Sequence, residues 1–499
     1  MSPTTIVSAP GKVLAAGGYL VLDQQYPGVV ISTSSRFYTV IQPSSGSANQ
    51  IVVRSPQFHQ AEWRYTVNYN AAGIQVNPQE DSIGGKNKFV HLALQHTLNL
   101  VSEIHSVAQV QERLSNGLDI AAVGDNDFYS QRAQLESLGL PRTTESLSQI
   151  TPFCHNGVKL TDVHKTGMGS SAALITSLVS ALLLHFAAIT QTDFANLEGD
   201  GRRLAHNASQ FVHCLAQGKV GSGFDVSSAV FGSQIYRRFS PAVLDPLMKG
   251  EVCHFATGTL KNVLTSSAWD YSFRPIQLPP LTRLVLADVE AGSDTPSLVG
   301  KVLKWRAHED SCETAKDLWM QIDESNQSLA RQLDALSQSY DQDKDVYKET
   351  VRQLVSLPAR EVSRFLSCTP CSLFISKAFY NLHQTTQQIR NLMRRMGDLA
   401  GVEIEPEQQT HLLDQSIEQA GVVGGGVPGA GGYDAIWLLI CSPPSLPDEQ
   451  QPLRRVESVW STFDESNVTP LLAQESVAKG ARVVQLDEIP GLREAIQRQ

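Results

Sequence analysis

The sequence contains few cysteines and no long apolar run. Its 499 residues include 7 cysteines, an odd number scattered along the chain, which is typical of a reducing compartment rather than of a disulfide scaffold. No stretch approaches the roughly 18 consecutive apolar residues that a membrane-spanning helix needs. The N-terminus also lacks the charged segment followed by an apolar segment that a secretory signal has. We therefore expect a cytoplasmic protein without a membrane partner.

An excess of positive charge is absent as well. The chain has 40 Lys and Arg residues against 50 Asp and Glu residues, and its formal net charge is -10. This balance argues against nucleic acid or an anionic membrane surface as the main partner. It does not exclude anionic small molecules, because a locally positive pocket can form on an acidic protein.

Strand-like and helix-like patterns are mixed without a regular βαβ rhythm, which predicts the α+β class. The chain exceeds the roughly 250–300 residues at which one hydrophobic core stops growing. We therefore expect two domains, residues 1–260 and 261–499. The expected helices cover residues 86–105, 170–189, 200–217 and 407–419, and the expected strands cover residues 28–41, 118–123, 281–289 and 433–441. Residues 42–49 are predicted to form the tip of a hairpin.

The segment KTGMGSSAALITS, residues 165–177, joins two glycines and two serines to a helix-like apolar run. Its glycines permit a close approach of the backbone, and the following helix N-terminus presents N–H groups suited to an anion. The serine hydroxyls can bind phosphate oxygens or Mg²⁺, and Lys165 adds a positive charge. The order differs from the Walker pattern, in which Lys and Ser or Thr directly follow the last glycine. An ordinary glycine turn with a serine N-cap is an equally good interpretation.

Three further segments contain residues suited to chemistry. Residues 424–439 join a glycine-rich loop to an apolar strand. Each glycine lowers stability by about 0.5–1 kcal/mol relative to alanine, through the entropy of the unfolded chain, so we expect something bulky against this backbone. A tight interdomain turn is the alternative. Asp225 lies among glycines and serines, where it can orient or deprotonate a substrate hydroxyl or simply cap a helix. Lys12 follows Pro10 and Gly11 and alone indicates little.

Together and in this order, the four segments resemble the GHMP family of small-molecule kinases. Within the family, the sequence is most similar to the branch that acts on 5-phosphomevalonate, and the similar segments include APGKVLAAGGYLVLD, HKTGMGSSAAL, AQGKVGSGFDVSSAVFGS, DVEAGSDTPSLVGKVLKW and GVPGAGGYDA. The resemblance implies an N-terminal domain like domain 2 of ribosomal protein S5 and a ferredoxin-like C-terminal domain. It also implies transfer of the γ-phosphoryl group of ATP, with Mg²⁺, to the phosphate of 5-phosphomevalonate in isoprenoid and sterol synthesis.

The resemblance also assigns roles to residues. Lys12 and Asp225 correspond to the catalytic residues, and Ser171 corresponds to a Mg²⁺-facing hydroxyl. The expected phosphate cradle comprises Gly167, Met168, Gly169, Ser170, Ser171, Ala172 and Ala173. The expected substrate-binding residues are Lys165, Lys219, Ser222, Gly429, Ala430 and Gly431. We expect a monomer that binds ATP and phosphomevalonate.

Two features qualify this assignment. An acceptor phosphate is already nucleophilic near pH 7, so a positioning or Mg²⁺-related role for Asp225 is at least as well supported as a role as general base. Many relatives have acidic residues where this chain has Gly18 and Cys214, which leaves the Mg²⁺ ligands open. The alternative functions are another activity of the family, such as that of mevalonate kinase, and a non-catalytic sensor that binds ATP and a metabolite.

Overall fold

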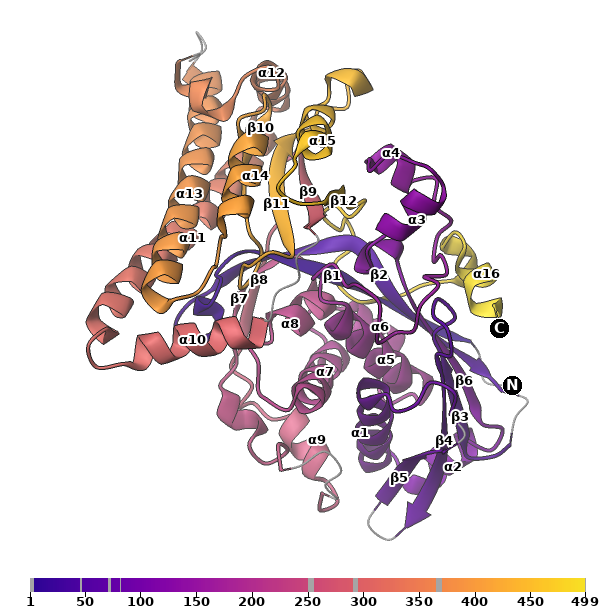
Figure 1. The fold of residues 1–499 in the computed structure, drawn as a ribbon. Coiled ribbons are helices and arrows are strands. Elements are labelled where there is room, and N and C mark those ends of the chain that lie inside the picture. Colours follow the sequence, from indigo (N-terminus) through magenta and orange to yellow (C-terminus); the bar gives the residue numbers. More distant parts are fainter. Residues whose placement is uncertain are drawn as a thin grey trace.

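The computed structural model describes residues 4–44, 47–70, 73–80, 82–249, 255–289, 295–364 and 370–498. Within these residues the chain forms two β-sheets, one of nine strands and one of four, and helices cover both (Figure 1). The larger sheet comes mainly from the first half of the chain, and the smaller one from the second half. The mixture of strands and helices confirms the predicted α+β class.

The larger sheet has the main strand order β13-β1-β2-β6-β3-β4-β5, with β7 pairing to β2 and β8 pairing to β7. All of its neighbouring strands are antiparallel except β3 and β6, which run parallel. Its strands are β1 (Thr5–Ala16), β2 (Gly28–Pro43), β3 (Gln50–Arg54), β4 (Glu62–Asn70), β5 (Gly73–Pro78), β6 (Leu118–Gly124), β7 (Gln234–Arg237), β8 (Ser272–Pro275) and β13 (Arg482–Val483).

Helices α1 (Lys88–Ile104) and α5 (Ser170–His185) pack against one face of this sheet, and α7 (Asp200–Gln217) packs against both helices. Because side chains alternate across a strand, Val7 and Phe37 face these helices, while Ile6 and Tyr38 face the opposite side. There they pack against α16 (Leu492–Gln497). The nearly all-apolar α5 is central to the larger core.

The smaller sheet has the order β10-β11-β9-β12 and is antiparallel throughout. Its strands are β9 (Thr282–Val289), β10 (Val422–Gly426), β11 (Ala435–Cys441) and β12 (Val468–Pro470). Leu284 and Leu286 face the core shared with the long helices α11 (Cys312–Gln342) and α13 (Pro370–Ala400). Val285 and Ala287 face the opposite side, which is covered by α14 (Glu407–Ile417) and α15 (Pro452–Thr462). In Figure 1, α11 and α13 lie side by side along the left of this sheet.

The remaining helices connect these elements. They are α2 (Val107–Arg113), α3 (Arg132–Ser137), α4 (Thr144–Leu147), α6 (Gln191–Ala195), α8 (Phe224–Phe231), α9 (Thr259–Leu264), α10 (Thr295–Ala307) and α12 (Lys344–Leu354).

The two sheets are joined by contacts far apart in sequence. The side chain of Asp288 in β9 is only 1% exposed. Its carboxylate accepts hydrogen bonds from Arg132 Nη2 at 3.3 Å and from His164 Nε2 at 3.2 Å. The hydrogen bond with Asp288 raises the pKa of His164 above its ordinary value of 6.5, although burial opposes this effect. Among the described residues, this buried carboxylate from the second half of the chain is therefore bound by two side chains from the first half.

Residues after β12 return to the larger sheet. The N–H of Leu472 donates to Asp127 Oδ1 at 2.8 Å, and β13 pairs with β1. Arg36 Nη2 donates to the Gly480 carbonyl at 2.6 Å, and Arg202 Nη2 donates to the Ala481 carbonyl at 3.0 Å. The division at residue 260 stays a prediction, and the larger sheet takes strands from both sides of it.

Most sequence-based element boundaries agree with the structure within a few residues. Helix α7 spans the expected residues 200–217, whereas α5 ends at His185 instead of residue 189. The predicted hairpin is wrong, because β6 lies between β2 and β3 in the sheet. Two residues of its expected tip, 45 and 46, lie outside the described residues.

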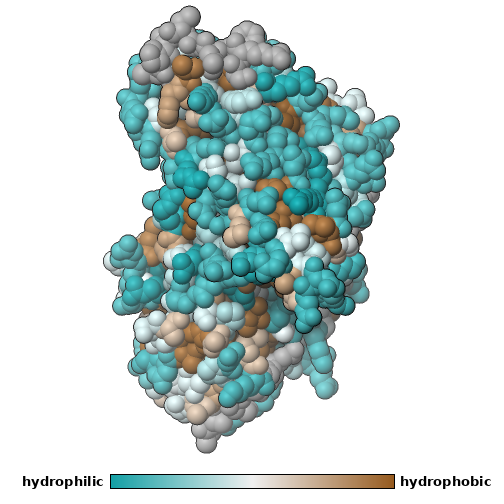
Figure 2. Space-filling model, turned by 90° about the vertical axis from the view of Figure 1, so that its left-hand side faces the viewer, coloured by the Kyte–Doolittle hydropathy of each residue, from teal (hydrophilic) through white to brown (hydrophobic). Residues whose placement is uncertain are grey.

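The face that includes α10, α11 and α13 is largely hydrophilic, with small separate hydrophobic patches (Figure 2). Leu303, Met320 and Leu399 are exposed large hydrophobic residues on these helices. In the part of the chain that the structure describes, no helix has both the length and the apolar character to cross a membrane.

Candidate active site

Lys12 lies in β1 and points to the N-terminus of α5. The pairing register between β1 and β2 shifts immediately before it. At Gly11, an added Cβ would lie 2.9 Å from the carbonyl oxygen of Met168, so only glycine lets the two segments approach this closely. The Lys12 N–H donates to Met168 O at 2.9 Å, and Nζ donates to the Gly167 carbonyl at 3.0 Å. Burial lowers the pKa of Lys12, and the charge of Asp225 opposes part of this effect.

The N-terminus of α5 has the form of an anion-binding cradle. Gly167 (φ 74) and Gly169 (φ 76) adopt the left-handed conformation that favours glycine. Gly169 is the N-cap, and no side chain caps the helix, so a serine N-cap is not what these residues form. The N–H groups of the first turn are therefore free of side-chain acceptors and can bind an anion. Ser170 and Ser171 are half-buried at this turn, whereas Met168, Ala172 and Ala173 are buried.

Asp225 lies in the first turn of α8, close to Ser171 and His213. The N-cap of α8 is Gly223 in the left-handed conformation (φ 79), so Asp225 is not the helix cap. Its Oδ1 accepts the N–H of Val226 at 2.9 Å, and its Oδ2 lies 3.8 Å from His213 Nε2. The same nitrogen of His213 lies 3.1 Å from Ser171 Oγ. Three helices, α5, α7 and α8, therefore bring these polar groups to one place.

The glycine-rich segment reaches the same region from the second half of the chain. The N–H of Gly429 donates to Leu14 O at 3.1 Å, two residues beyond Lys12. The hydroxyl of Tyr19, which follows Gly17 and Gly18, donates to the Ala430 carbonyl at 2.7 Å, so Tyr19 has a structural role. The expectation of one loop over residues 424–432 is wrong in part, because residues 424–426 belong to β10.

The tip of this segment packs tightly against Ile404. The N–H of Gly432 donates to the Ile404 carbonyl at 2.8 Å. Gly431 (φ 76) lies so close that an added Cβ would overlap the same carbonyl oxygen. A close contact with the backbone of Ile404 therefore explains the glycine at position 431.

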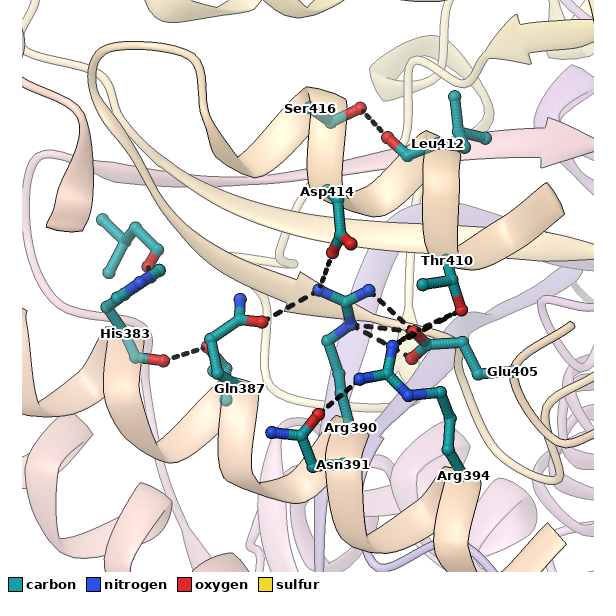
Figure 3. A network of polar contacts seen from close by, with 12 residues as sticks. His383, Gln387, Arg390, Asn391, Arg394, Glu405, Thr410, Leu412, Asp414 and Ser416 are labelled. Carbon is teal, nitrogen blue, oxygen red and sulfur yellow. Dashed lines mark hydrogen bonds and ion pairs between the residues drawn. The ribbon is translucent and has the colours of Figure 1, made fainter. Parts of the chain in front are cut away.

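A buried ion network holds the segment on which this tip rests (Figure 3). Glu405 is completely buried, and its carboxylate accepts hydrogen bonds from Arg390 Nη2 at 2.7 Å and from Arg394 Nη1 at 3.0 Å. Arg390, which is also buried, forms a second ion pair with Asp414 at 2.8 Å. Burial lowers the pKa of Arg390, but its hydrogen bonds and charge interactions with Glu405 and Asp414 outweigh burial and raise it overall. The network links α13 to α14 directly behind the glycine-rich segment.

The other expected substrate-binding residues lie at the edge of this arrangement. Lys165 and Lys219 are exposed, and no hydrogen bond or ion pair among the described residues joins either one to Lys12 or Asp225. Ser222 is half-buried, and its carbonyl accepts the hydroxyl of Tyr236 at 3.0 Å. Their roles stay predictions.

The oxygen donors at this place fit a Mg²⁺ ion. The Ser171 hydroxyl and the Asp225 carboxylate are hard oxygen ligands, and Mg²⁺ commonly takes one or two protein ligands together with substrate phosphates and waters. Cys214 does not add a donor, because burial raises the pKa of its thiol to about 12. Gly18 has no side chain, and an added Cβ would lie 2.6 Å from Met393 Cε. In the described residues, no group of three or more His, Cys, Asp or Glu side chains could hold a metal ion by itself.

His213 is a residue of this place that the sequence analysis missed. The resemblance to relatives concerns the neighbouring position, Cys214. Successive helical residues point about 100° apart, so the side chains of His213 and Cys214 face different directions. His213 and Gln217 are four residues apart on α7 and therefore share one face. Because α7 leads into the segment that contains Asp225, this polar pair on one helix face is the signal that could have identified His213.

Comparisons with known proteins show which family the chain resembles. The family described as GHMP kinases N terminal domain matches residues 150–233. A peroxisomal phosphomevalonate kinase of Arabidopsis thaliana is 37% identical over 496 residues, 94% of this chain and 94% of that protein. A phosphomevalonate kinase of Aspergillus fumigatus is 36% identical and covers 92% of this chain and 90% of its own length.

A solved structure supports the fold. The phosphomevalonate kinase of Streptococcus pneumoniae, in complex with phosphomevalonate and AMPPNP, has a TM-score of 0.55 at 15% identity, over 94% of this chain and 99% of that chain. The extensive similarity to the plant and fungal proteins confirms the resemblance seen in the motifs. The chain belongs to the GHMP kinase family and, within it, to the phosphomevalonate kinases.

Proposed function

We propose that this protein transfers the γ-phosphoryl group of ATP to (R)-5-phosphomevalonate, giving (R)-5-diphosphomevalonate and ADP in the mevalonate pathway of isoprenoid and sterol synthesis. The observation that supports this most directly is the meeting of Lys12, the uncapped N-terminus of α5 and Asp225 at one place. The similarity to phosphomevalonate kinases over most of the chain supports the choice of acceptor.

Each of these groups suits phosphoryl transfer. The reaction has a loose transition state with charge spread over the transferred oxygens, so positioning and positive charge contribute more than covalent chemistry. The N–H groups of α5 bind phosphate oxygens, and the ammonium group of Lys12 stabilises the transferred charge. Ser171 and Asp225 would hold Mg²⁺ together with the nucleotide, and the ion would neutralise phosphate charge there.

Asp225 acts mainly as a positioning group in this proposal. The second pKa of a phosphate monoester is near 6, so the acceptor is largely a dianion at neutral pH and needs no strong base. An alcohol acceptor would need one. Replacing Asp225 by Asn therefore lowers turnover by weakening orientation and cation binding rather than by removing a base.

The acceptor occupies the side of the site formed by Gly429, Ala430 and Gly431, with Ser222, Lys165 and Lys219 nearby in this proposal. The lysines supply a local positive field on an acidic protein. The Michaelis constant for phosphomevalonate in Lys165→Ala and Lys219→Ala tests these residues. Unchanged values in both variants would remove them from the site.

We also propose a cytoplasmic monomer. The odd number of scattered cysteines favours a reducing compartment, and those that the structure describes, Cys154, Cys214, Cys312 and Cys441, are free. The Arabidopsis relative is named peroxisomal, so organelle targeting is the outcome to test against. Subcellular fractionation and light scattering after gel filtration measure location and oligomeric state.

Release of ADP, measured with a coupled assay, tests the reaction. The purified protein is given mevalonate, phosphomevalonate and diphosphomevalonate in turn, with ATP and Mg²⁺ at fixed concentrations. Turnover with phosphomevalonate alone is the expected result. Turnover with mevalonate alone would assign the sister activity, and release with none of the three would favour a sensor.

A further inference from the structure

His213 contacts the reaction site but has no role in the proposed reaction so far. It lies on α7, and only 4% of its side chain is exposed. Its Nε2 is 3.1 Å from Ser171 Oγ, 3.3 Å from the amide nitrogen of Gln217 and 3.8 Å from Asp225 Oδ2. Phe89 of α1 packs beside the ring, with centroids 6.2 Å apart. The ring is thus fixed by packing, with one nitrogen directed at Ser171.

The direction of the hydrogen bond to Ser171 decides what this serine can bind. A hydroxyl has one proton to donate and two lone pairs that accept. If the proton goes to a protein acceptor, the lone pairs are left for a cation. If the proton is free, it can go to a phosphate oxygen instead.

The neighbours of His213 Nε2 favour its role as the acceptor. Gln217 presents an amide N–H₂, which only donates, and Ser171 presents a hydroxyl, which can donate. The carboxylate of Asp225 lies beyond hydrogen-bond distance of this nitrogen. Asp225 therefore keeps Oδ2 free for other partners, since its Oδ1 already accepts the N–H of Val226.

We propose that His213 is a positioning residue whose Nε2 accepts a hydrogen bond from the Ser171 hydroxyl. This hydrogen bond directs the lone pairs of Ser171 Oγ to the cation that accompanies the nucleotide. This inference rests on the proposed function, because it takes Ser171 as a nucleotide-site residue. The carboxylate of Asp225, the second proposed partner of the cation, has its Oδ2 3.8 Å from the same nitrogen.

Two amide substitutions test the position of the acceptor. In His213→Gln the side-chain amide reaches approximately to Nε2, and in His213→Asn it reaches only to the position of Nδ1. AMPPNP affinity is measured by calorimetry for the wild type and both variants, once in Mg²⁺ and once in EDTA. We expect His213→Asn to lose roughly threefold to tenfold in affinity in Mg²⁺ and little in EDTA, as for one lost hydrogen bond. His213→Gln should stay close to the wild type.

Ser171→Ala completes a double-mutant cycle. If His213 acts through Ser171, the double variant Ser171→Ala/His213→Asn binds Mg²⁺–AMPPNP no more weakly than Ser171→Ala alone. Fully additive losses would overturn the proposal, because His213 would then act independently. Equal losses in Mg²⁺ and in EDTA would also overturn it, because Ser171 would then be a donor to phosphate.

A spectroscopic measurement on the wild type reads the protonation of Nε2 directly and needs only one folded His213 variant, for assignment of the signal. The protein is labelled with ¹⁵N-histidine, and the His213 signal is assigned from its absence in His213→Gln or His213→Asn. At about pH 8 we expect Nε2 to have the ¹⁵N chemical shift of an unprotonated acceptor, and an N–H signal at Nε2 would overturn the proposal. Failure of phosphomevalonate turnover in the wild type, with nucleotide binding as expected, would instead reject the proposed acceptor and leave this inference standing.

Discussion

Replacing Glu405 by Gln tests whether the buried ion network stabilises the fold. The carboxylate accepts from Arg390 Nη2 at 2.7 Å, from Arg394 Nη1 at 3.0 Å and from Thr410 Oγ1 at 3.1 Å. Its side chain is 0% exposed, and that of Arg390 is 3% exposed. Gln keeps the shape but removes the charge and turns one oxygen into a donor that faces guanidinium groups.

The expected cost follows from burial. Removing one partner of a buried ion pair costs about 3–5 kcal/mol, because the remaining charge is left uncompensated. Asp414 still pairs with Arg390 but has 57% of its side chain exposed, so it compensates only in part. We therefore expect Glu405→Gln to fall near the lower end of this range, measured by urea unfolding.

The chain offers a matched control on the neighbouring helix end. Glu418 pairs with Arg360 at 2.5 Å, but their side chains are 58% and 60% exposed. Because solvent screens exposed pairs, Glu418→Gln should cost at most about 1 kcal/mol. Equal losses in the two variants would refute the reasoning from burial. A raised Michaelis constant for phosphomevalonate in Glu405→Gln alone would show that the network also positions the glycine-rich segment.

Three further outcomes are expected. Lys12→Met should lower kcat by roughly 100-fold or more in the ADP-release assay, with an unchanged unfolding midpoint, because it removes charge that acts in the transition state. Gly431→Ala should destabilise the protein more than Gly429→Ala in urea unfolding, because both glycines have positive φ but only at Gly431 would the new Cβ overlap a backbone carbonyl. The hydrogen bond with Asp288 raises the pKa of His164, so its stabilisation is complete below the ordinary value of 6.5 and is lost as the pH rises through the folded-state value. The difference in unfolding midpoint between wild type and His164→Gln should therefore be larger at about pH 6 than at about pH 8.5, and a constant difference would contradict it.

Local patterns predicted the helices well, and partners distant in sequence set the limits. Helix α7 has the bounds expected from its sequence, and it ends at Gly218, which adopts the left-handed conformation (φ 72) of a helix C-cap. The hairpin predicted at residues 42–49 does not form, because β3 pairs with β6, which comes some sixty residues later. A turn-like sequence says nothing about a third strand that enters between its two neighbours.

The site divides in the same way. Glycine-rich motifs indicated where the backbone needs glycine: Gly431 lies against the Ile404 carbonyl, and Gly167 and Gly169 have positive φ. His213 has no motif of its own, since its role depends on the packing of α7 against α5 and α8. The packing of Tyr19 onto Ala430 likewise needs two segments that only the tertiary fold brings together.

The return of residues 471–484 to the larger sheet has a consequence for how the protein is made. On the ribosome, β1 and the buried guanidinium groups of Arg36 and Arg202 are synthesised long before the carbonyls of Gly480 and Ala481 that they bind. Until those carbonyls emerge, the nascent sheet has an open edge at β1 and two cations without these acceptors. We therefore expect the first half of the chain to reach its final form only after the second half has been translated, so that a stalled or truncated chain yields no partially active kinase.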